Sequence, residues 1–178
     1  DGISTLLNSP IHEVRHCGLI ILVYQYPKYD RKKIYQFYSE NFDSINNWDL
    51  VDTTAPNIVG DYLYHNPNKA NVLLDYAHSE NLWIRRISIV STLAFIRQNQ
   101  FSLTLEISKI LLGDSHDLIH KAVGWMLREI YKRDQHLIKS FLEQNYAQLP
   151  RTTLRYAIER MDKQERLNFL KARFNVSN

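Results

Sequence analysis

"DLIHKAVGWMLREIYKRD", residues 117–134, is the stretch that decides the fold class. Its apolar residues recur at intervals of three and four, which places them along one face of an α-helix. The expected buried stripe consists of Ile119, Val123, Met126, Leu127 and Ile130. The stretch therefore predicts an amphipathic helix that packs against other helices.

The same period extends over most of the chain. It predicts antiparallel helix pairs at 10–27 with 31–42, 47–64 with 68–77, 81–98 with 100–112, 115–133 with 134–146, and 150–160 with 162–173. The first helices of the pairs begin about 34 to 38 residues apart, a period typical of helical repeat proteins. The sequence thus predicts an all-α fold, a single-domain α-solenoid over residues 1–178 with a curved, basic concave face. An irregular helical bundle is the alternative.

The openings of four predicted pairs are also weakly similar to one another. "HEVRHCGLIILV" (12–23), "LWIRRISIVSTL" (82–93), "LIHKAVGWMLRE" (118–129) and "LPRTTLRYAIER" (149–160) each place a basic residue early and continue with an apolar stripe. This similarity supports a repeat architecture.

The composition of the 178 residues is that of a globular protein, with 44% apolar residues and a formal net charge of +3. Only 5 Gly and 5 Pro are present, which favours helices over a turn-rich β fold. No apolar run reaches a membrane span and no signal-peptide pattern is visible, so a cytoplasmic location is expected. The chain begins with Asp1 and not Met, which suggests a fragment of a longer protein.

The single cysteine, Cys17, excludes a disulfide framework and a cysteine-based metal cluster. We expect it to be a small buried hydrophobic residue.

The predicted helix at 115–133 also carries a basic face. Lys121, Trp125, Arg128 and Lys132 follow at spacings of four, three and four. A tryptophan in a helix is usually a core residue, whereas one surrounded by three cations can also contact a nucleic acid. Both interpretations of Trp125 stay open on the residues alone. Gly124 beside it indicates either a packing requirement or a close backbone approach.

The doublet Arg85 and Arg86 lies in a helix that is apolar around most of its circumference. One arginine can face solvent, and the other must emerge beside apolar neighbours. Such an arginine pairs with a carboxylate or with a phosphate, and the sequence does not choose between them. For Arg151, Arg155 and Arg160 we expect a solvated helix face.

Trp48 and Asp52 stand four residues apart in "NNWDLVDTTAPNIVGDYLYHNP", residues 46–67. In a helix the indole and the carboxylate would share a face. Asp52, followed by Thr53, Thr54 and Pro56, also fits the N-cap of a helix.

Other catalytic patterns are missing from the sequence. It has no glycine-rich phosphate loop, no Gly-x-Ser-x-Gly and no His-Glu-x-x-His. The pairs His12/His16 and His116/His120 have helical spacing but no carboxylate at a matching position, which makes a weak zinc signal. We therefore expect no metal and no cofactor.

The segments "NNWDLVDTTAPNIVGDYL" (46–63), "LWIRRISIVSTLAFIR" (82–97), "HKAVGWMLREIYKRD" (120–134) and "LPRTTLRYAIERM" (149–161) resemble, in this order and spacing, the DNA alkylation repair enzyme family of AlkD-type DNA glycosylases. The resemblance runs from about residue 8 to 161. It implies an α-solenoid of HEAT-like repeats. Members of the family usually carry further N-terminal helices, and the resemblance leads us to expect that this chain lacks them.

The resemblance implies excision of cationic N3- and N7-alkylated purines from duplex DNA, without base flipping, in base excision repair. Asp52 matches the catalytic aspartate, and Trp48 and Trp125 match the tryptophans that contact the deoxyribose of the lesion. Arg86 matches a phosphate-contacting arginine, and Arg128 with Lys132 matches further cationic contacts. Lys121 and Arg85 complete the expected DNA-binding set.

The implied partner is double-stranded DNA with alkylated bases. A monomer in a bacterial-type cytoplasm, associated with the nucleoid when it acts, is the implied setting. Two other hypotheses stay open: a non-catalytic HEAT-repeat module that binds DNA or protein, and a truncated, inactive member of the family.

Overall fold

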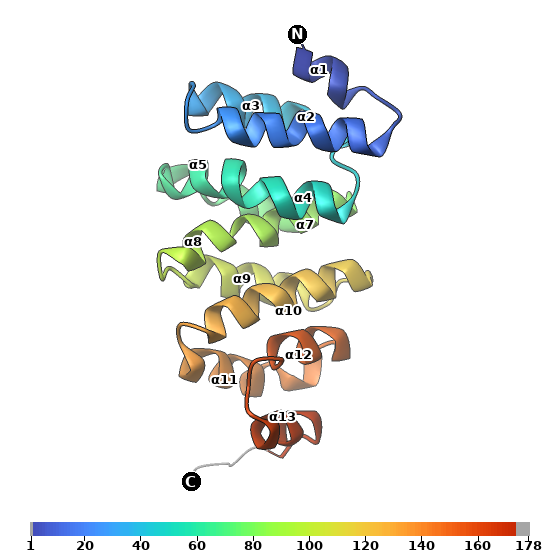
Figure 1. Ribbon diagram of the computed structural model, residues 1–178. Helices are drawn as coiled ribbons and strands as arrows, with labels where there is room; N and C mark the ends of the chain where they lie inside the picture. The colour runs from blue at the N-terminus through green and yellow to red at the C-terminus, as the bar shows by residue number, and fades with distance from the viewer. Residues whose placement is uncertain (1, 174–178) are drawn as a thin grey trace. The chain divides into compact units, whose positions relative to one another are not determined.

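The computed structural model describes residues 2–173, and this part of the chain is built from helices without a β-strand. The α-helices are α1 Gly2–Leu7, α2 His12–Gln25, α3 Arg31–Glu40, α4 Trp48–Ala55, α5 Asp61–Tyr64, α6 Val72–Ala77, α7 Leu82–Ser91, α8 Leu93–Arg97, α9 Ser102–Leu111, α10 Asp117–Tyr131, α11 Gln135–Gln144, α12 Arg151–Ala157 and α13 Lys163–Leu170 (Figure 1). The predicted all-α class is confirmed, and each predicted helix corresponds to one of these segments or to a run of them.

The chain divides into two compact units, with the boundary between Phe95 and Ile96. In the first unit α4 packs against both α2 and α7, so that its two sides face different helices (Figure 1). Leu50 and Val51 of α4 and Ile87 of α7 are fully buried. Burial of such side chains contributes about 1.5 to 3 kcal/mol each. This packing fixes the position of the polar side chains on α4.

The predicted helix at 47–64 changes type in its middle. α4 passes into a π-helical turn, Pro56–Gly60, and then into α5. Pro56 has no backbone N–H to donate, so an α-helical hydrogen bond cannot form at this position. Gly60 lies against α7, where an added Cβ would be 2.2 Å from the backbone oxygen of Ser91. The π-helical turn therefore contains a residue without a backbone N–H, Pro56, and a residue whose backbone contacts α7 closely, Gly60.

In the second unit α10 packs against α9, α11 and α12. The predicted stripe is confirmed, because none of its side chains is exposed: Ile119, Val123, Met126, Leu127 and Ile130. Gly124 serves packing, since a Cβ there would lie 2.4 Å from the Cβ of Tyr156 and 2.7 Å from the backbone oxygen of Thr153. The close approach of α10 and α12 depends on this glycine.

The expectation that Cys17 is buried was wrong. Its thiol is exposed on α2, because the buried side of the helix at this level is formed by the next two residues, Gly18 and Leu19.

The solvated face expected for Arg151, Arg155 and Arg160 is confirmed, since all three are exposed. Within residues 2–173, no helix has the length and hydrophobicity that a bilayer span requires.

Candidate functional site

The start of α4 places Trp48 and Asp52 on consecutive turns. The side chain of Asn47 accepts a hydrogen bond from the backbone N–H of Trp48 at 2.8 Å and caps the helix. Trp48 is the first helical residue, and it is 52% exposed. The N-cap interpretation of Asp52 was therefore wrong, because a competing cap five residues earlier starts the helix there. Asp52 lies inside the helix and its carboxylate is available for other partners.

Those partners belong to Arg86 on α7. Nε of Arg86 donates to Oδ1 of Asp52, and Nη2 donates to Oδ2, each at 2.8 Å. The side chain of Arg86 is 5% exposed and that of Asp52 is 16% exposed. The pair is therefore bidentate and largely shielded from water, the geometry in which a guanidinium binds a carboxylate most strongly. Of the two partners left open for this arginine, the carboxylate is the one that the structure contains.

Burial raises the pKa of the Asp52 carboxyl above its ordinary value of 3.8. Desolvation disfavours the anion, and the hydrogen bonds and charge of Arg86 offset this only in part. The negative charge of Asp49 on the same helix adds a smaller increase. A carboxylate whose pKa is raised at a partly exposed position fits a functional site better than a plain surface ion pair.

Arg85, the other member of the doublet, makes a structural contact with backbone. Its Nη1 donates to the carbonyl oxygens of Ser79 and Glu80, both at 2.9 Å. The same arrangement occurs once more in the first unit, where Nη1 of Arg15 donates to Ser9 at 3.0 Å and Pro10 at 3.2 Å. This recurrence supports the internal repeat seen in the sequence. A contact between Arg85 and DNA stays a prediction.

Each of the three predicted cations on α10 and at its C-cap has a carboxylate partner in its own unit. Lys121 pairs with Asp117 at 2.9 Å, Lys132 pairs with Glu129 at 2.6 Å, and Arg128 pairs with Glu159 in the turn that follows α12. These partners reduce the positive charge of the face. Its basic character and its contact with DNA stay predictions.

Trp125 is half-buried on the same helix. Its exposure is therefore intermediate between that of a core residue and that of an exposed residue in contact with a ligand. Trp125 belongs to the second unit, whereas Trp48 and Asp52 belong to the first.

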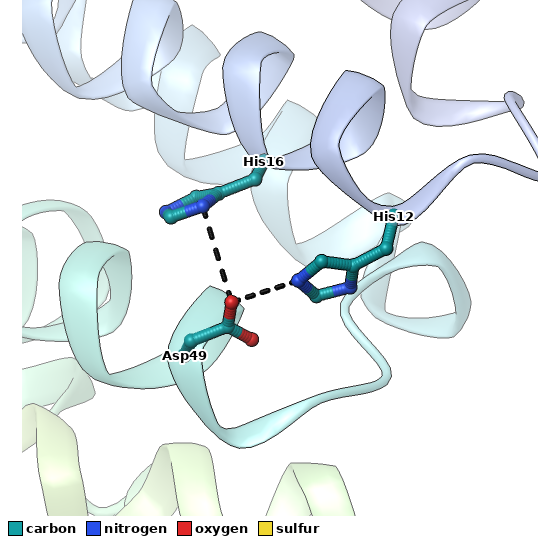
Figure 2. Close-up of side chains that lie close together, drawn as sticks. All are labelled: His12, His16 and Asp49. Atoms are coloured by element: carbon teal, nitrogen blue, oxygen red, sulfur yellow. Dashed lines mark hydrogen bonds and ion pairs between the residues drawn. The ribbon is translucent and has the colours of Figure 1, made fainter.

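The predicted histidine pair His12 and His16 has a carboxylate partner, Asp49, that was not predicted from the sequence. Nε2 of His12 lies 2.7 Å from Oδ2 of Asp49, and Nδ1 of His16 lies 3.9 Å from the same oxygen (Figure 2). The histidines are on α2 and the carboxylate is on the first turn of α4. The signal that could have found Asp49 is the repeat period: His12 and Asp49 are 37 residues apart, and Asp52 and Arg86 are 34 apart. A residue on the first helix of one pair therefore faces the residue one repeat period later, on the first helix of the next pair, as α2 faces α4 and α4 faces α7.

The described residues also line an apolar cavity of about 560 Å³ among α1, α2 and α3, where Leu22, Ile34 and Phe37 form part of its wall. Trp48 and Asp52 do not line this cavity.

Comparison with known proteins decides the family. The family model described as DNA alkylation repair enzyme matches residues 1–161. The chain belongs to the DNA alkylation repair enzyme family. A solved structure described as a predicted DNA alkylation repair enzyme from Enterococcus faecalis has a similar fold, with a TM-score of 0.76, 16% sequence identity, and coverage of 90% of this chain and 74% of that chain. No curated protein sequence matches the chain.

Membership of the DNA alkylation repair enzyme family confirms the resemblance stated from the sequence. It implies DNA as the substrate and an enzymatic role. The residues matched by the family model include all those predicted for the site.

Proposed function

We propose that the chain is a DNA glycosylase that excises cationic N3- and N7-alkylated purines from duplex DNA by hydrolysis of the glycosidic bond, without base flipping, as the first step of base excision repair. One observation carries this proposal. The exposed indole of Trp48 and the carboxylate of Asp52 lie one turn apart on α4, and the carboxylate is held by Arg86.

The chemistry of a cationic lesion fits a site with one carboxylate. Alkylation at N3 or N7 gives the purine a positive charge, so it leaves as a neutral base and needs no general acid. As the bond breaks, positive charge develops on the deoxyribose, and an anion near the sugar stabilises it and orients the attacking water. We assign this role to Asp52. Arg86 holds both carboxylate oxygens in one orientation, which preorganises the group.

The aromatic residues contribute a second stabilisation. The electron-rich face of an indole attracts a cation by about 0.5 to 2 kcal/mol, which corresponds to a several-fold to roughly 30-fold effect on rate. We propose that Trp48 acts on the deoxyribose in this way. Its exposed position makes the ring face accessible to DNA. Trp125 of α10 is assigned the same kind of contact by the family resemblance.

The backbone of the DNA requires cations. We propose that Arg86, Arg128 and Lys132, with Lys121 and Arg85, contact phosphates, and that binding is consequently salt-dependent and largely independent of sequence. Arg86 would use the small exposed part of its side chain for this contact. The cations of α10 would exchange their carboxylate partners for phosphates. A monomer in the cytoplasm, bound to the nucleoid when it acts, completes the proposal.

The test is release of N7-methylguanine or N3-methyladenine from alkylated duplex DNA by the purified chain. Asp52→Asn should lower the single-turnover rate by at least about tenfold, since it removes the charge that stabilises the sugar cation. Asp61→Asn is the matched control, because Asp61 also pairs with an arginine, Arg31, in the same unit. Equal rates for Asp52→Asn and the wild type would show that the carboxylate has no catalytic role.

A second candidate function is a non-catalytic module that binds DNA or protein. It is favoured by the hydrogen bonds of both Asp52 oxygens to Arg86, which leave the carboxylate partly neutralised. This candidate predicts DNA binding that is abolished by a modest increase in salt, together with no base release from any alkylated substrate. Measurable release of a methylpurine by the wild type would exclude it.

A further inference from the structure

His12, His16 and Asp49 place three metal-ligand atoms around a common point in the first unit. His12 and His16 lie one turn apart on α2, and Asp49 reaches them from the first turn of α4 (Figure 2). The candidate ligand atoms all lie within 4.8 Å of one another. No carboxylate stands at a matching sequence position beside this histidine pair, and the packing of α4 against α2 supplies one.

The distances suit a small divalent cation. Two ligand atoms that are about 2.0 Å from a tetrahedral zinc ion lie about 3.3 Å apart. The distances from Oδ2 of Asp49 to the two histidine nitrogens, 2.7 and 3.9 Å, fall on either side of this value. The three side chains are between 25% and 32% exposed, which leaves a path for an ion to enter.

Neighbouring hydrogen bonds determine which nitrogen of His16 carries the proton in its neutral ring. The hydroxyl of Thr53 donates its single hydrogen to the carbonyl oxygen of Asp49 at 2.7 Å. It must therefore accept from Nε2–H of His16, which lies 3.3 Å away. In the neutral ring, Nδ1 of His16 then presents a lone pair toward a carboxylate oxygen. Two electron-rich atoms that face each other in this way are stabilised by a cation between them.

The carboxylate is oriented in a similar manner. Oδ1 of Asp49 accepts a hydrogen bond from the backbone N–H of Leu50 at 2.9 Å, which directs Oδ2 toward the histidines. Partners of this kind around the ligands are typical of protein metal sites, because they fix ring tautomer and ligand orientation.

We propose that Nε2 of His12, Nδ1 of His16 and Oδ2 of Asp49 bind one divalent transition-metal ion of the zinc type. Two imidazoles and one carboxylate suit zinc, and three protein ligands leave a fourth position for water or another small ligand. The ion joins α2 to α4 and thereby stabilises the start of the helix that carries Trp48 and Asp52. This proposal is independent of base excision.

The experiment uses the full chain without a polyhistidine tag, freed of metal by chelation and titrated calorimetrically with Zn²⁺ at pH 7.5, with Co²⁺ as a spectroscopic probe. We expect one ion per chain, a Co²⁺ visible spectrum of tetrahedral type, and a rise in melting temperature on saturation. His12→Gln, His16→Gln and Asp49→Asn should each weaken Zn²⁺ binding at least about tenfold and abolish the thermal shift. These substitutions lie at partly exposed positions, and circular dichroism without metal verifies that each variant is folded.

Two controls make the result specific. The double variant H116Q/H120Q removes the other pair of histidines with helical spacing, and it should bind Zn²⁺ like the wild type. The exposed thiol of Cys17, next to His16, could compete as a zinc ligand. Cys17→Ser removes this thiol and should also leave Zn²⁺ binding unchanged. The proposal is overturned if no saturable 1:1 binding occurs, if binding survives in H12Q/H16Q, or if the two controls lose as much affinity as the ligand variants. In these cases the three side chains form a hydrogen-bonded cluster without a metal.

Discussion

Arg86 of α7 and Asp52 of α4 are joined by two hydrogen bonds of 2.8 Å, and both side chains are largely shielded from water. The pair therefore links two helices of the first unit and holds the proposed catalytic carboxylate at the same time. A substitution of either residue changes both stability and chemistry, so the two effects must be measured separately.

Arg86→Ala should lower the free energy of unfolding by about 3 kcal/mol or more, because it leaves a buried carboxylate without its partner. Arg31→Ala is the matched control, since Arg31 pairs with Asp61 while its own side chain is 47% exposed. The control should cost no more than about 1 kcal/mol. Urea denaturation of the three proteins gives both values. A double mutant with Asp52→Ala that costs less than the sum of the single changes would confirm the coupling.

The pH dependence follows from the raised pKa of Asp52. Between the unfolded value, near 3.8, and the higher folded value, the folded state binds the proton more tightly. The contribution of this group to stability is therefore complete below the unfolded pKa and is lost as the pH rises through the folded pKa. Catalysis requires the ionised form, so the single-turnover rate should fall toward acid with a midpoint above 3.8. Rates between pH 4 and 8, corrected for spontaneous base loss, measure it, and a midpoint at or below 3.8 would contradict the assignment.

Trp48→Ala should separate function from stability. The indole is 52% exposed, so its loss should change the free energy of unfolding by less than about 1 kcal/mol. The rate of methylpurine release should fall several-fold to roughly 30-fold, because the sugar cation loses the ring face. Tyr29→Ala, at another exposed aromatic residue of the same unit, should leave the rate unchanged. Equal rates for Trp48→Ala and the wild type would remove Trp48 from the site.

Gly124→Ala should destabilise the second unit by about 1 to 3 kcal/mol, or more, because the new Cβ meets Tyr156 and the backbone of Thr153. Gly113→Ala provides the control, since no heavy atom lies within 4 Å of a Cβ at that position and its φ is not positive. Thermal unfolding of the two variants compares them directly. If they melt at the same temperature, the contact between α10 and α12 does not depend on Gly124.

Lys132→Gln tests the proposed DNA contact of α10. If Lys132 binds a phosphate, the slope of log K against log salt should become less negative by about 1 for duplex DNA of any sequence. Lys163→Gln, at an exposed lysine that begins α13, is expected to leave the slope unchanged. A fluorescence anisotropy titration at several salt concentrations measures both. An unchanged slope for Lys132→Gln would show that its partner is Glu129 alone.

The helices could be predicted from the sequence because their signals are local. The stripe on α10 is read from spacing alone, and all of its residues are buried. Contacts between helices are harder to predict, since they depend on the packing of segments that are distant in sequence. The carboxylate partner of Arg86 was one of two open possibilities, and the approach of Asp49 to His12 was not predicted. The N-cap predicted at Asp52 and the burial predicted for Cys17 were wrong because other residues, Asn47 in the first case and Gly18 with Leu19 in the second, take those positions.

The π-helical turn Pro56–Gly60 acts as a one-residue insertion in the helical run that begins at Trp48. Because each α-helical residue turns the chain by about 100°, α5 is rotated by about this angle from the position that an uninterrupted helix would give it. Deletion of one residue within the turn would restore an uninterrupted α-helix, so the side chains of α5 would keep the orientation in which they now pack on α3, and Trp48 and Asp52 would stay in place. An alignment of this chain with relatives that lack the turn therefore needs its gap here, downstream of the proposed catalytic residues.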